Sequence, residues 1–198
     1  MNFRPSSILL QIFHSEELPL KTVGIPLILT FKLDELSQDR LNLWRQTHFP
    51  KERNYLKAHL TIYHQLPGQE IVTIKEKLAE FAAVRAPIAI HFDRLMSRQG
   101  FVGVGVTSSE MLVYKSALNT LFMPSLRAQD KEPYRPHVTV TNKGSPREGE
   151  AVFKVVAEEF QPWDGAILGL ELYHYRGGPW EFADSFLFDT SGSHSDAI

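Results

Sequence analysis

The chain has 198 residues, of which 43% are hydrophobic, and its formal net charge is −2. This length and composition fit one substantial domain, and the near-neutral charge argues against tight binding to long duplex nucleic acid. The sequence contains no cysteine, which excludes disulfides, thiol catalysis and cysteine-ligated zinc. A reducing, cytoplasmic location fits this composition.

The start of the sequence is not expected to form a signal peptide, and the end is expected to be a tail. Residues 1–24 include a short apolar stretch without the cleavage pattern of a signal peptide, so we expect an N-terminal extension there. No apolar run reaches the ~18 residues that a membrane span needs. Residues 191–198 are small and polar, which predicts a flexible tail. A single domain is therefore expected over residues 25–190.

The predicted elements come in the same order in two halves of the chain. Runs of β-branched and aromatic residues predict strands, and apolar residues three or four positions apart predict helices. In the first half the order is strand 26–33, helix 35–47, strand 57–66, helix 69–84 and strand 86–95. In the second half it is strand 101–108, helix 109–122, strand 134–143, helix 147–160 and strand 165–175, with one extra strand at 180–188. Asp34 and Ser109 are the expected N-caps of the first helix in each half.

This repeated order indicates an internal duplication. "KLAEF" at 77–81 and "VAEEF" at 156–160 are separated by almost the same number of positions as His59 and His137. Two units are too few for a solenoid, so we expect a pseudo-twofold molecule with a shared cleft. Its lobes would come from residues 26–95 and 100–188.

The same motif occurs on one strand of each half. "KAHLTIYHQL" (57–66) contains His59 and Thr61, and "YRPHVTVTNK" (134–143) contains His137 and Thr139. Of the eight histidines, only these two are followed two positions later by serine or threonine. Because side chains alternate along a strand, each histidine shares a face with its threonine. We expect both pairs to point into the cleft.

Two such pairs form a polar site suited to a phosphoryl group. Threonine hydroxyls can donate hydrogen bonds to the non-bridging oxygens, and imidazoles can exchange protons with the attacking and leaving oxygens. Histidine suits this role because its ordinary pKa is about 6.5, so one ring can be neutral and the other protonated near neutral pH. No metal-ligand set is visible, and no cofactor is expected.

With these paired motifs the sequence resembles the 2H phosphoesterase superfamily, which includes RNA 2′,3′-cyclic phosphodiesterases, also called 2′-5′ RNA ligases. That family is defined by two His-x-Thr/Ser-x motifs, and the resemblance covers about residues 25–188. It implies a bilobal, duplicated α+β fold, in which we expect two antiparallel sheets to flank a central cleft with helices on the outside. It also implies catalysis without a metal.

The resemblance implies hydrolysis of a cyclic phosphodiester, such as a nucleoside or RNA-terminal 2′,3′-cyclic phosphate, with reversible 2′-5′ ligation as a further activity. It suggests His137 as base and His59 as acid, and these roles exchange when the reaction runs towards ligation. The expected partner is a small nucleotide or an RNA 3′ end, and the protein is expected to be a monomer. Two alternatives stay open: a non-catalytic nucleotide- or RNA-binding module, and a phosphodiesterase for another small cyclic or 2′-5′ linked nucleotide.

Further residues are candidates for substrate binding. Tyr63 and Thr141 continue the two cleft-facing rows, with ordinary strand packing as the alternative. Tyr134 and Arg135 directly precede the second motif, although a solvated arginine is the alternative for Arg135. Trp180 could stack on a base or could belong to the core or rim.

Overall fold

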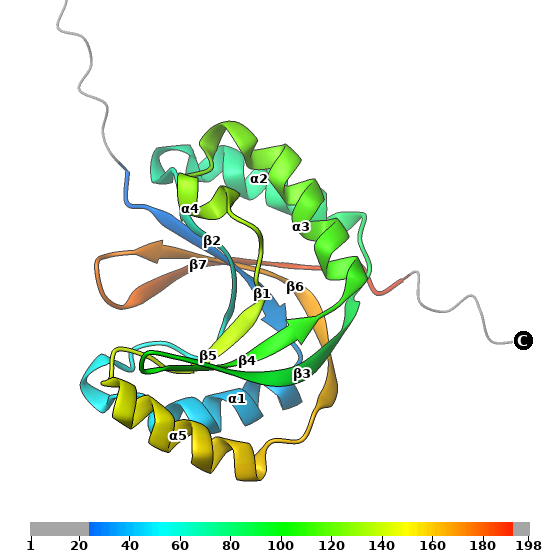
Figure 1. Cartoon of the computed structure of the whole chain (residues 1–198). Coiled ribbons are helices and arrows are strands. Elements are labelled where there is room, and N and C mark those ends of the chain that lie inside the picture. Colours follow the sequence, from blue (N-terminus) through cyan, green and yellow to red (C-terminus); the bar gives the residue numbers. More distant parts are fainter. Residues whose placement is uncertain (1–23, 192–198) are drawn as a thin grey trace, which may run out of the picture.

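Seven antiparallel strands form the centre of the structure, a computed structural model that describes residues 24–191 (Figure 1). The strands are β1 (Leu27–Leu33), β2 (Leu60–Leu66), β3 (Ile88–Arg98), β4 (Phe101–Thr107), β5 (His137–Thr141), β6 (Trp163–Tyr175) and β7 (Trp180–Leu187). The α-helices are α1 (Glu35–His48), α2 (Ile71–Ala83), α3 (Ser109–Phe122), α4 (Ala128–Lys131) and α5 (Pro146–Glu159). This order confirms the expected α+β class, and short α4 is an addition to it.

Side-chain caps explain where the helices begin. The backbone N–H of Ser37 donates to Asp34 at 2.9 Å, so Asp34 caps α1 as expected. Helix α3 is capped by Ser108, whose hydroxyl accepts from Met111 N–H at 3.3 Å. The prediction of Ser109 as this cap was therefore wrong by one residue, because both neighbouring serines are suitable N-caps.

The sheet closes on itself. Its strand order is β1-β2-β5-β4-β3-β6-β7, and β1 also pairs with β6, so the first six strands form a ring with β7 beside β6. Exchanging β1 with β4, β2 with β5 and β3 with β6 leaves the set of neighbouring strands in this ring unchanged. The topology is therefore twofold, as the duplication predicts, and the two strands that carry the histidine motifs are neighbours.

The expectation of two separate sheets is corrected by this closure. The 13-residue strand β6 pairs with β3 near its start and with β1 further along, which joins the two halves on one side. On the other side a single bridge, Leu60 to Val138, joins β2 to β5. Hydrophobic alternation predicts where strands occur but not which strands pair. The closure of the sheet could therefore not be predicted from this pattern.

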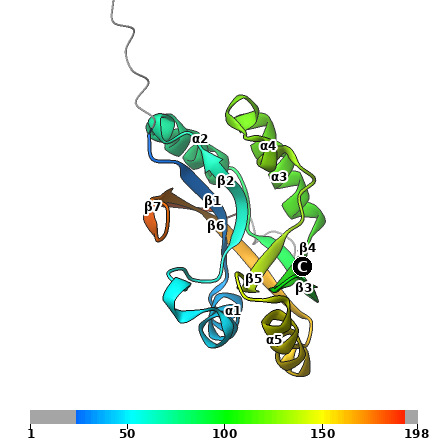
Figure 2. The same ribbon diagram turned by 60° about the vertical axis from the view of Figure 1, so that its left-hand side comes forward.

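The helices lie in two groups at opposite ends of the sheet (Figures 1 and 2). One group holds α1 and α5, with α1 against β5 and α5 against β3 and β4. The other holds α2 and α3, with α2 against β7 and α3 against β3. Each group therefore combines helices from both halves of the chain. The core between them is built from fully buried aliphatic and aromatic side chains such as Leu29, Leu60, Phe92, Val104 and Leu170.

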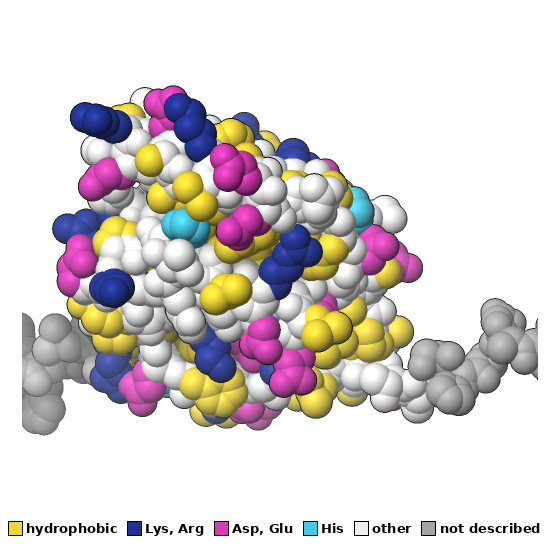
Figure 3. Space-filling view, turned by 90° about the horizontal axis from the view of Figure 1, so that it is seen from below, with side chains coloured by type: hydrophobic (Ala, Val, Ile, Leu, Met, Phe, Trp, Pro, Cys, Tyr) yellow, Lys and Arg dark blue, Asp and Glu magenta, His cyan; other side chains and the backbone are white. Residues whose placement is uncertain are grey.

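The expected N-terminal extension and C-terminal tail fall almost entirely outside the described residues. Within residues 24–191, no helix is both long enough and apolar enough to cross a membrane. Figure 3 shows the face over α1 and α5, on which basic and acidic side chains are interspersed. This face carries no broad patch of a single charge.

Candidate active site

The two histidine motifs meet where β2 pairs with β5. The bridging residues Leu60 and Val138 are fully buried, so the residues on either side of each turn to the opposite face. Four of the residues that line one pocket of about 600 Å³ on that face are His59, Thr61, His137 and Thr139. The structure thus brings together the four side chains singled out from the sequence.

The backbone holds each of these histidines in the same way. The ring Nδ1 of His59 lies 2.8 Å from the carbonyl oxygen of Lys57, and Nδ1 of His137 lies 2.8 Å from that of Arg135. Because a carbonyl oxygen only accepts, Nδ1 carries the hydrogen in both rings. Nε2 is then the nitrogen of each ring that can take up or release a proton in the pocket.

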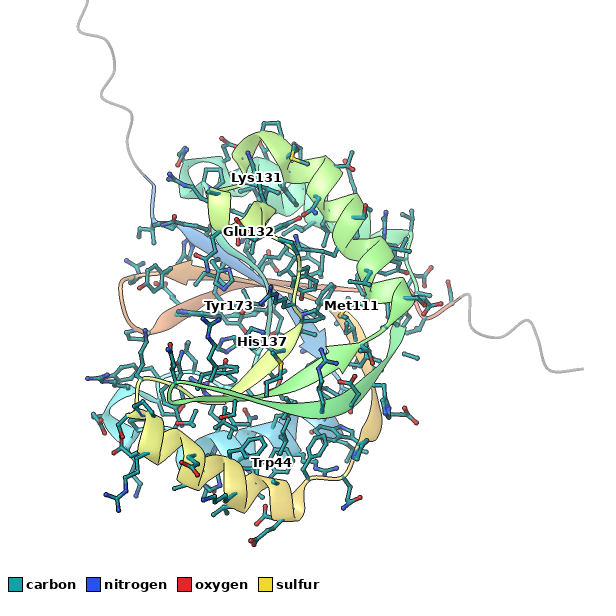
Figure 4. All side chains as sticks on the ribbon, viewed as in Figure 1. Trp44, Met111, Lys131, Glu132, His137 and Tyr173 are labelled. Atoms are coloured by element: carbon teal, nitrogen blue, oxygen red, sulfur yellow. The ribbon has the colours of Figure 1, made fainter. Side chains whose placement is uncertain are left out.

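An aromatic side chain contacts each histidine. The rings of His59 and Trp180 have centroids 4.4 Å apart, and Phe101 stands edge-on to His137 at 5.3 Å. His137 lies near the middle of the molecule, between the two helix groups (Figure 4). These contacts fix the ring planes and shield one side of each ring from water.

The surroundings lower the pKa of His59 to about 4. The largest cause is the loss of hydration, which disfavours the imidazolium form. The hydrogen bond to Lys57 opposes this shift, and the charges of Arg45 and His137 add to it. Although His59 keeps an edge open to the pocket, the protein surrounds the rest of the ring. His59 is therefore neutral in the empty pocket at neutral pH.

Arg45 links the segment before β2 to β5. Its guanidinium is buried and donates to the carbonyl oxygens of Leu56, just before β2, and Thr139 on β5, at 3.0 and 3.1 Å. It also lies 4.0 Å over the ring of Phe49. Burial lowers the pKa of Arg45 to about 10, so it remains charged at neutral pH. Arg45 therefore helps to hold the two motifs at a fixed separation.

The family of this chain follows from a comparison with family models. A model described as "2'-5' RNA ligase superfamily" matches residues 33–179, which is most of the chain. The chain belongs to the 2′-5′ RNA ligase superfamily. A search of the curated proteins finds no match to this sequence.

Several solved structures have a fold similar to that of this chain. The protein TT0787 of Thermus thermophilus is 14% identical, with a TM-score of 0.57 over 82% of this chain and 97% of that chain. LigT of E. coli, complexed with 3'-AMP, is 16% identical, with a TM-score of 0.55 over 82% and 98%. A structure described as a phosphoesterase is also 16% identical, with a TM-score of 0.55 over 83% and 99%. At these identities the likeness shows the fold.

The predicted positions of Tyr63 and Thr141 were wrong. Tyr63 is fully buried and its hydroxyl donates to Asn119 at 2.8 Å, while Thr141 is buried and donates to the backbone oxygen of His48 at 3.0 Å. Neither side chain lines the pocket with His59, Thr61, His137 and Thr139. After the threonine of each motif, the next polar side chain that lines the pocket is therefore one residue later than expected, at His64 and Asn142.

A β-bulge on each motif strand explains this error. On β2, Thr61 and Tyr63 lie opposite consecutive residues of β1, so Ile62 is an extra residue there. On β5, Thr139 and Thr141 likewise lie opposite consecutive residues of β4. An extra residue reverses the alternation of faces, which sends the residue two places after each threonine into the core.

The other three candidates do line the pocket: Tyr134, Arg135 and Trp180. The hydroxyl of Tyr134 donates to the carbonyl oxygen of Thr61 at 2.9 Å, which ties the segment before β5 to β2. Burial raises the pKa of Tyr134, so this phenol stays protonated. Arg176, which directly follows β6, pairs with Glu181.

Sequence reasoning missed several other residues of the pocket. Phe101 comes from the start of β4, Lys115 from α3, His64 from the end of β2, Asp130 from α4 and Asn142 from the end of β5. Of these, Phe101, His64 and Asn142 lie on predicted strands, and the bulges on β2 and β5 reverse the expected faces of His64 and Asn142. Lys115 lies on a helix whose packing partner the sequence does not specify.

Proposed function

We propose that this protein hydrolyses a cyclic phosphodiester, namely a nucleoside or RNA-terminal 2′,3′-cyclic phosphate, by acid–base catalysis with two histidines. The observation that carries the proposal is the equivalent placement of His59 and His137 on adjacent strands, each with Nδ1 bound to its own backbone. Each ring then presents one nitrogen for proton transfer. A site that only bound nucleotides would not need two such rings.

The proposed reaction is a direct displacement at phosphorus. One histidine accepts a proton from water while the water oxygen attacks the phosphorus atom. The bond from phosphorus to one ribose oxygen breaks, and the other histidine gives that oxygen a proton. Thr61 and Thr139 donate hydrogen bonds to the non-bridging oxygens and stabilise the charge that develops on them. The product is a nucleoside monophosphate with a free ribose hydroxyl.

The lowered pKa of His59 favours this residue as the base. A base must be neutral, and the lowered pKa of His59 keeps it neutral in the free protein. His137 is then the acid that protonates the leaving oxygen. This proposal exchanges the two roles that the family resemblance suggested. In the reverse, ligating direction His59 would be the acid.

The solved structures support a nucleotide substrate. LigT of E. coli is described as complexed with 3'-AMP, with ATP, with NADP+ and with phosphate. For the present chain we propose a small nucleotide or an RNA 3′ end as the partner. Trp180, which lies against His59, is positioned to stack on the nucleobase.

The test is a panel of the four nucleoside 2′,3′-cyclic phosphates and a short RNA ending in a cyclic phosphate. We expect turnover of members of this panel, with the product identified by chromatography as the 2′- or the 3′-phosphate. Incubation of an RNA bearing a 5′-hydroxyl with one ending in a 2′,3′-cyclic phosphate tests the ligating direction. Nucleotide binding without turnover of any member would refute the proposed hydrolysis.

A further inference from the structure

A second group of charged and polar side chains lines the pocket beside the histidine motifs. It consists of His64, Asp130 and Lys115. These residues come from β2, α4 and α3, and none of them belongs to a His-x-Thr motif. The proposed hydrolysis does not use them.

Asp130 fixes the orientation of His64. Its Oδ1 accepts from the backbone N–H of His64 at 2.9 Å and lies 3.0 Å from the ring Nδ1, while its Oδ2 accepts from the N–H of Gln65 at 3.3 Å. Burial alone would raise the pKa of Asp130, but the hydrogen bonds from His64 outweigh it, so the pKa is lowered and the group is a carboxylate. Nδ1 of His64 therefore carries a hydrogen, and Nε2 is its free nitrogen.

The two members of this pair differ in exposure. The side chain of Asp130 is 1% exposed, whereas that of His64 is 54% exposed. The carboxylate is thus enclosed by its hydrogen-bond donors, and the imidazole is the part that a ligand can reach.

Lys115 is a buried cation on the wall of the same pocket. The residue is 4% exposed, and its ammonium donates to the side-chain oxygen of Asn119 at 2.5 Å. It lies over the rings of Tyr63 and Tyr134, at 4.3 and 5.4 Å from their centroids. Within residues 24–191, no carboxylate lies within ion-pair distance of it. Burial lowers the pKa of Lys115, and the charge of Asp130 opposes only part of this shift. The bond to Asn119 uses one of its three N–H donors.

Burying an ammonium without an ion pair is costly, and this cost is reduced when an anionic ligand supplies the missing charge. We infer that Lys115 and His64 form a second anion subsite, which binds a further phosphate of the substrate next to the phosphoryl group held by the two His-x-Thr pairs. The inference rests on the proposed function and narrows its substrate class. The favoured substrate is a 2′,3′-cyclic phosphate that also carries a phosphate on its 5′ side, rather than a 5′-hydroxyl nucleoside.

The spacing along β2 separates the two subsites. His64 follows Thr61 by three residues, so at ~3.3 Å per residue their Cα atoms lie at most about 10 Å apart, and the bulge at Ile62 shortens this separation. The pocket of about 600 Å³ that both residues line has room for two phosphates of one ligand. The acidic groups that also line the pocket are Asp130 and Glu132. Asp130 is enclosed by its donors, and Glu132 is exposed at the end of α4, where Arg135 lies nearby in the chain (Figure 4).

The test compares three substrates that differ only on the 5′ side: adenosine 2′,3′-cyclic phosphate, its 5′-phosphorylated form, and the dinucleotide ApA with a terminal 2′,3′-cyclic phosphate. We expect kcat/KM to be about 10-fold or more higher for a substrate with the second phosphate, because hydrogen bonds between charged groups are strong. A preference for the 5′-phosphorylated nucleotide identifies a terminal phosphate as the ligand. A preference for the dinucleotide alone identifies the internal phosphate of an RNA chain.

In His64→Ala and in Lys115→Met, we expect kcat/KM for substrates with and without the second phosphate to differ by about twofold or less. His91→Ala is the matched control, since His91 forms the same kind of pair with Asp164 at 2.8 Å on the exposed surface, away from the pocket. It is expected to keep the full preference. If Lys115→Met fails to fold, the exposed His64 decides the test by itself.

Equal kcat/KM for all three substrates in the unmodified protein, or an undiminished preference in a folded His64→Ala variant, would overturn the subsite. A protein that hydrolyses none of the three, and no other member of the panel of cyclic phosphates above, would refute the proposed function instead. In that case calorimetry with 5′-AMP and adenosine tests the subsite independently. Tighter binding of 5′-AMP that is lost in His64→Ala would support it, and equal binding would reject it.

Discussion

His59 and His137 share one local geometry but differ in environment. Both rings bond through Nδ1 to the carbonyl oxygen two residues earlier. Trp180 packs against His59 with a centroid distance of 4.4 Å, whereas Phe101 meets His137 only edge-on. This difference is the physical basis for giving the two histidines different roles in one reaction.

The base and acid roles can be told apart with a substrate whose leaving group needs no proton, because its hydrolysis does not depend on the acid. Thymidine 3′-(4-nitrophenyl phosphate) has no 2′-hydroxyl and releases 4-nitrophenolate, so its hydrolysis requires a base but no acid. We expect His137→Ala to keep far more of the normal rate on this substrate than on a cyclic phosphate. His59→Ala is expected to lose the rate on both. The opposite pattern would make His137 the base.

The pH profile tests the environment of His59. Because a neutral His59 is required and its pKa is about 4, kcat/KM is expected to stay level on the acid side until the pH approaches 4. Trp180→Ala lets water reach the ring, which stabilises the imidazolium and raises the pKa towards its ordinary value of about 6.5. The acid limb of kcat/KM then moves to higher pH. An acid limb near pH 6 in the unmodified protein would contradict this reading.

On each motif strand the side chains alternate regularly as far as the threonine, and a bulge interrupts the alternation after it. Alternation predicted that His59 and Thr61, and likewise His137 and Thr139, share a pocket, and the structure places them so. The bulge that follows each threonine was not predictable, because its signal lies in the pairing with β1 and β4 rather than in the strand itself. The sequence thus predicts the elements and the paired motifs, but not the residues just beyond them.

The same limit applies to the rest of the pocket. Trp180 begins β7, and the glycine-containing turn at 176–179 indicates a hairpin with β6, but no local signal shows that this end of the hairpin reaches His59. Lys115 is buried on α3 among polar and aromatic side chains, where its position in the helix alone would favour a solvated lysine. Closure of the ring is a property of strand partners, so it follows from the whole chain and not from any one segment.

Replacement of Arg45 tests how the motif strands are held together. Arg45→Met removes the donor to the carbonyl oxygens of Leu56 and Thr139, and hydrogen bonds from a charged group contribute about 1.5–3 kcal/mol each. The variant no longer buries a charge, which offsets part of this loss. We expect the free energy of unfolding to fall by about 2–4 kcal/mol in urea titrations. Arg147→Met, at an exposed position of α5, is the control, and equal stability of the two variants would exclude a linking role for Arg45.

At the scale of the whole molecule, the twofold ring explains why the site lies where it does. The exchange that relates the two halves maps β2 onto β5, so these neighbours flank the pseudo-twofold axis. Equivalent residues on both strands therefore approach each other at this axis. A duplicated chain can in this way convert one His-x-Thr motif into a four-residue site.

Activity without added metal is a prediction for the whole molecule. The chain has no cysteine, and within residues 24–191 no three His, Asp or Glu side chains are grouped so that they could hold a metal ion. The two histidines supply both proton transfers in the proposed reaction. We expect hydrolysis of a cyclic phosphate to be unchanged after dialysis against EDTA. Loss of activity that zinc, magnesium or manganese restores would show that a metal takes part.

The paired acid–base role of the histidines is tested most directly by one measurement: kcat/KM for adenosine 2′,3′-cyclic phosphate in His59→Ala and His137→Ala, with the fold verified by circular dichroism. Removing one partner of a proton-transfer pair costs typically ~10²–10⁴-fold. We expect a loss in this range for each variant, and little further loss when both are combined, because the two rings act as a unit. Hydrolysis at a near-normal rate by either folded variant would contradict the two-histidine mechanism.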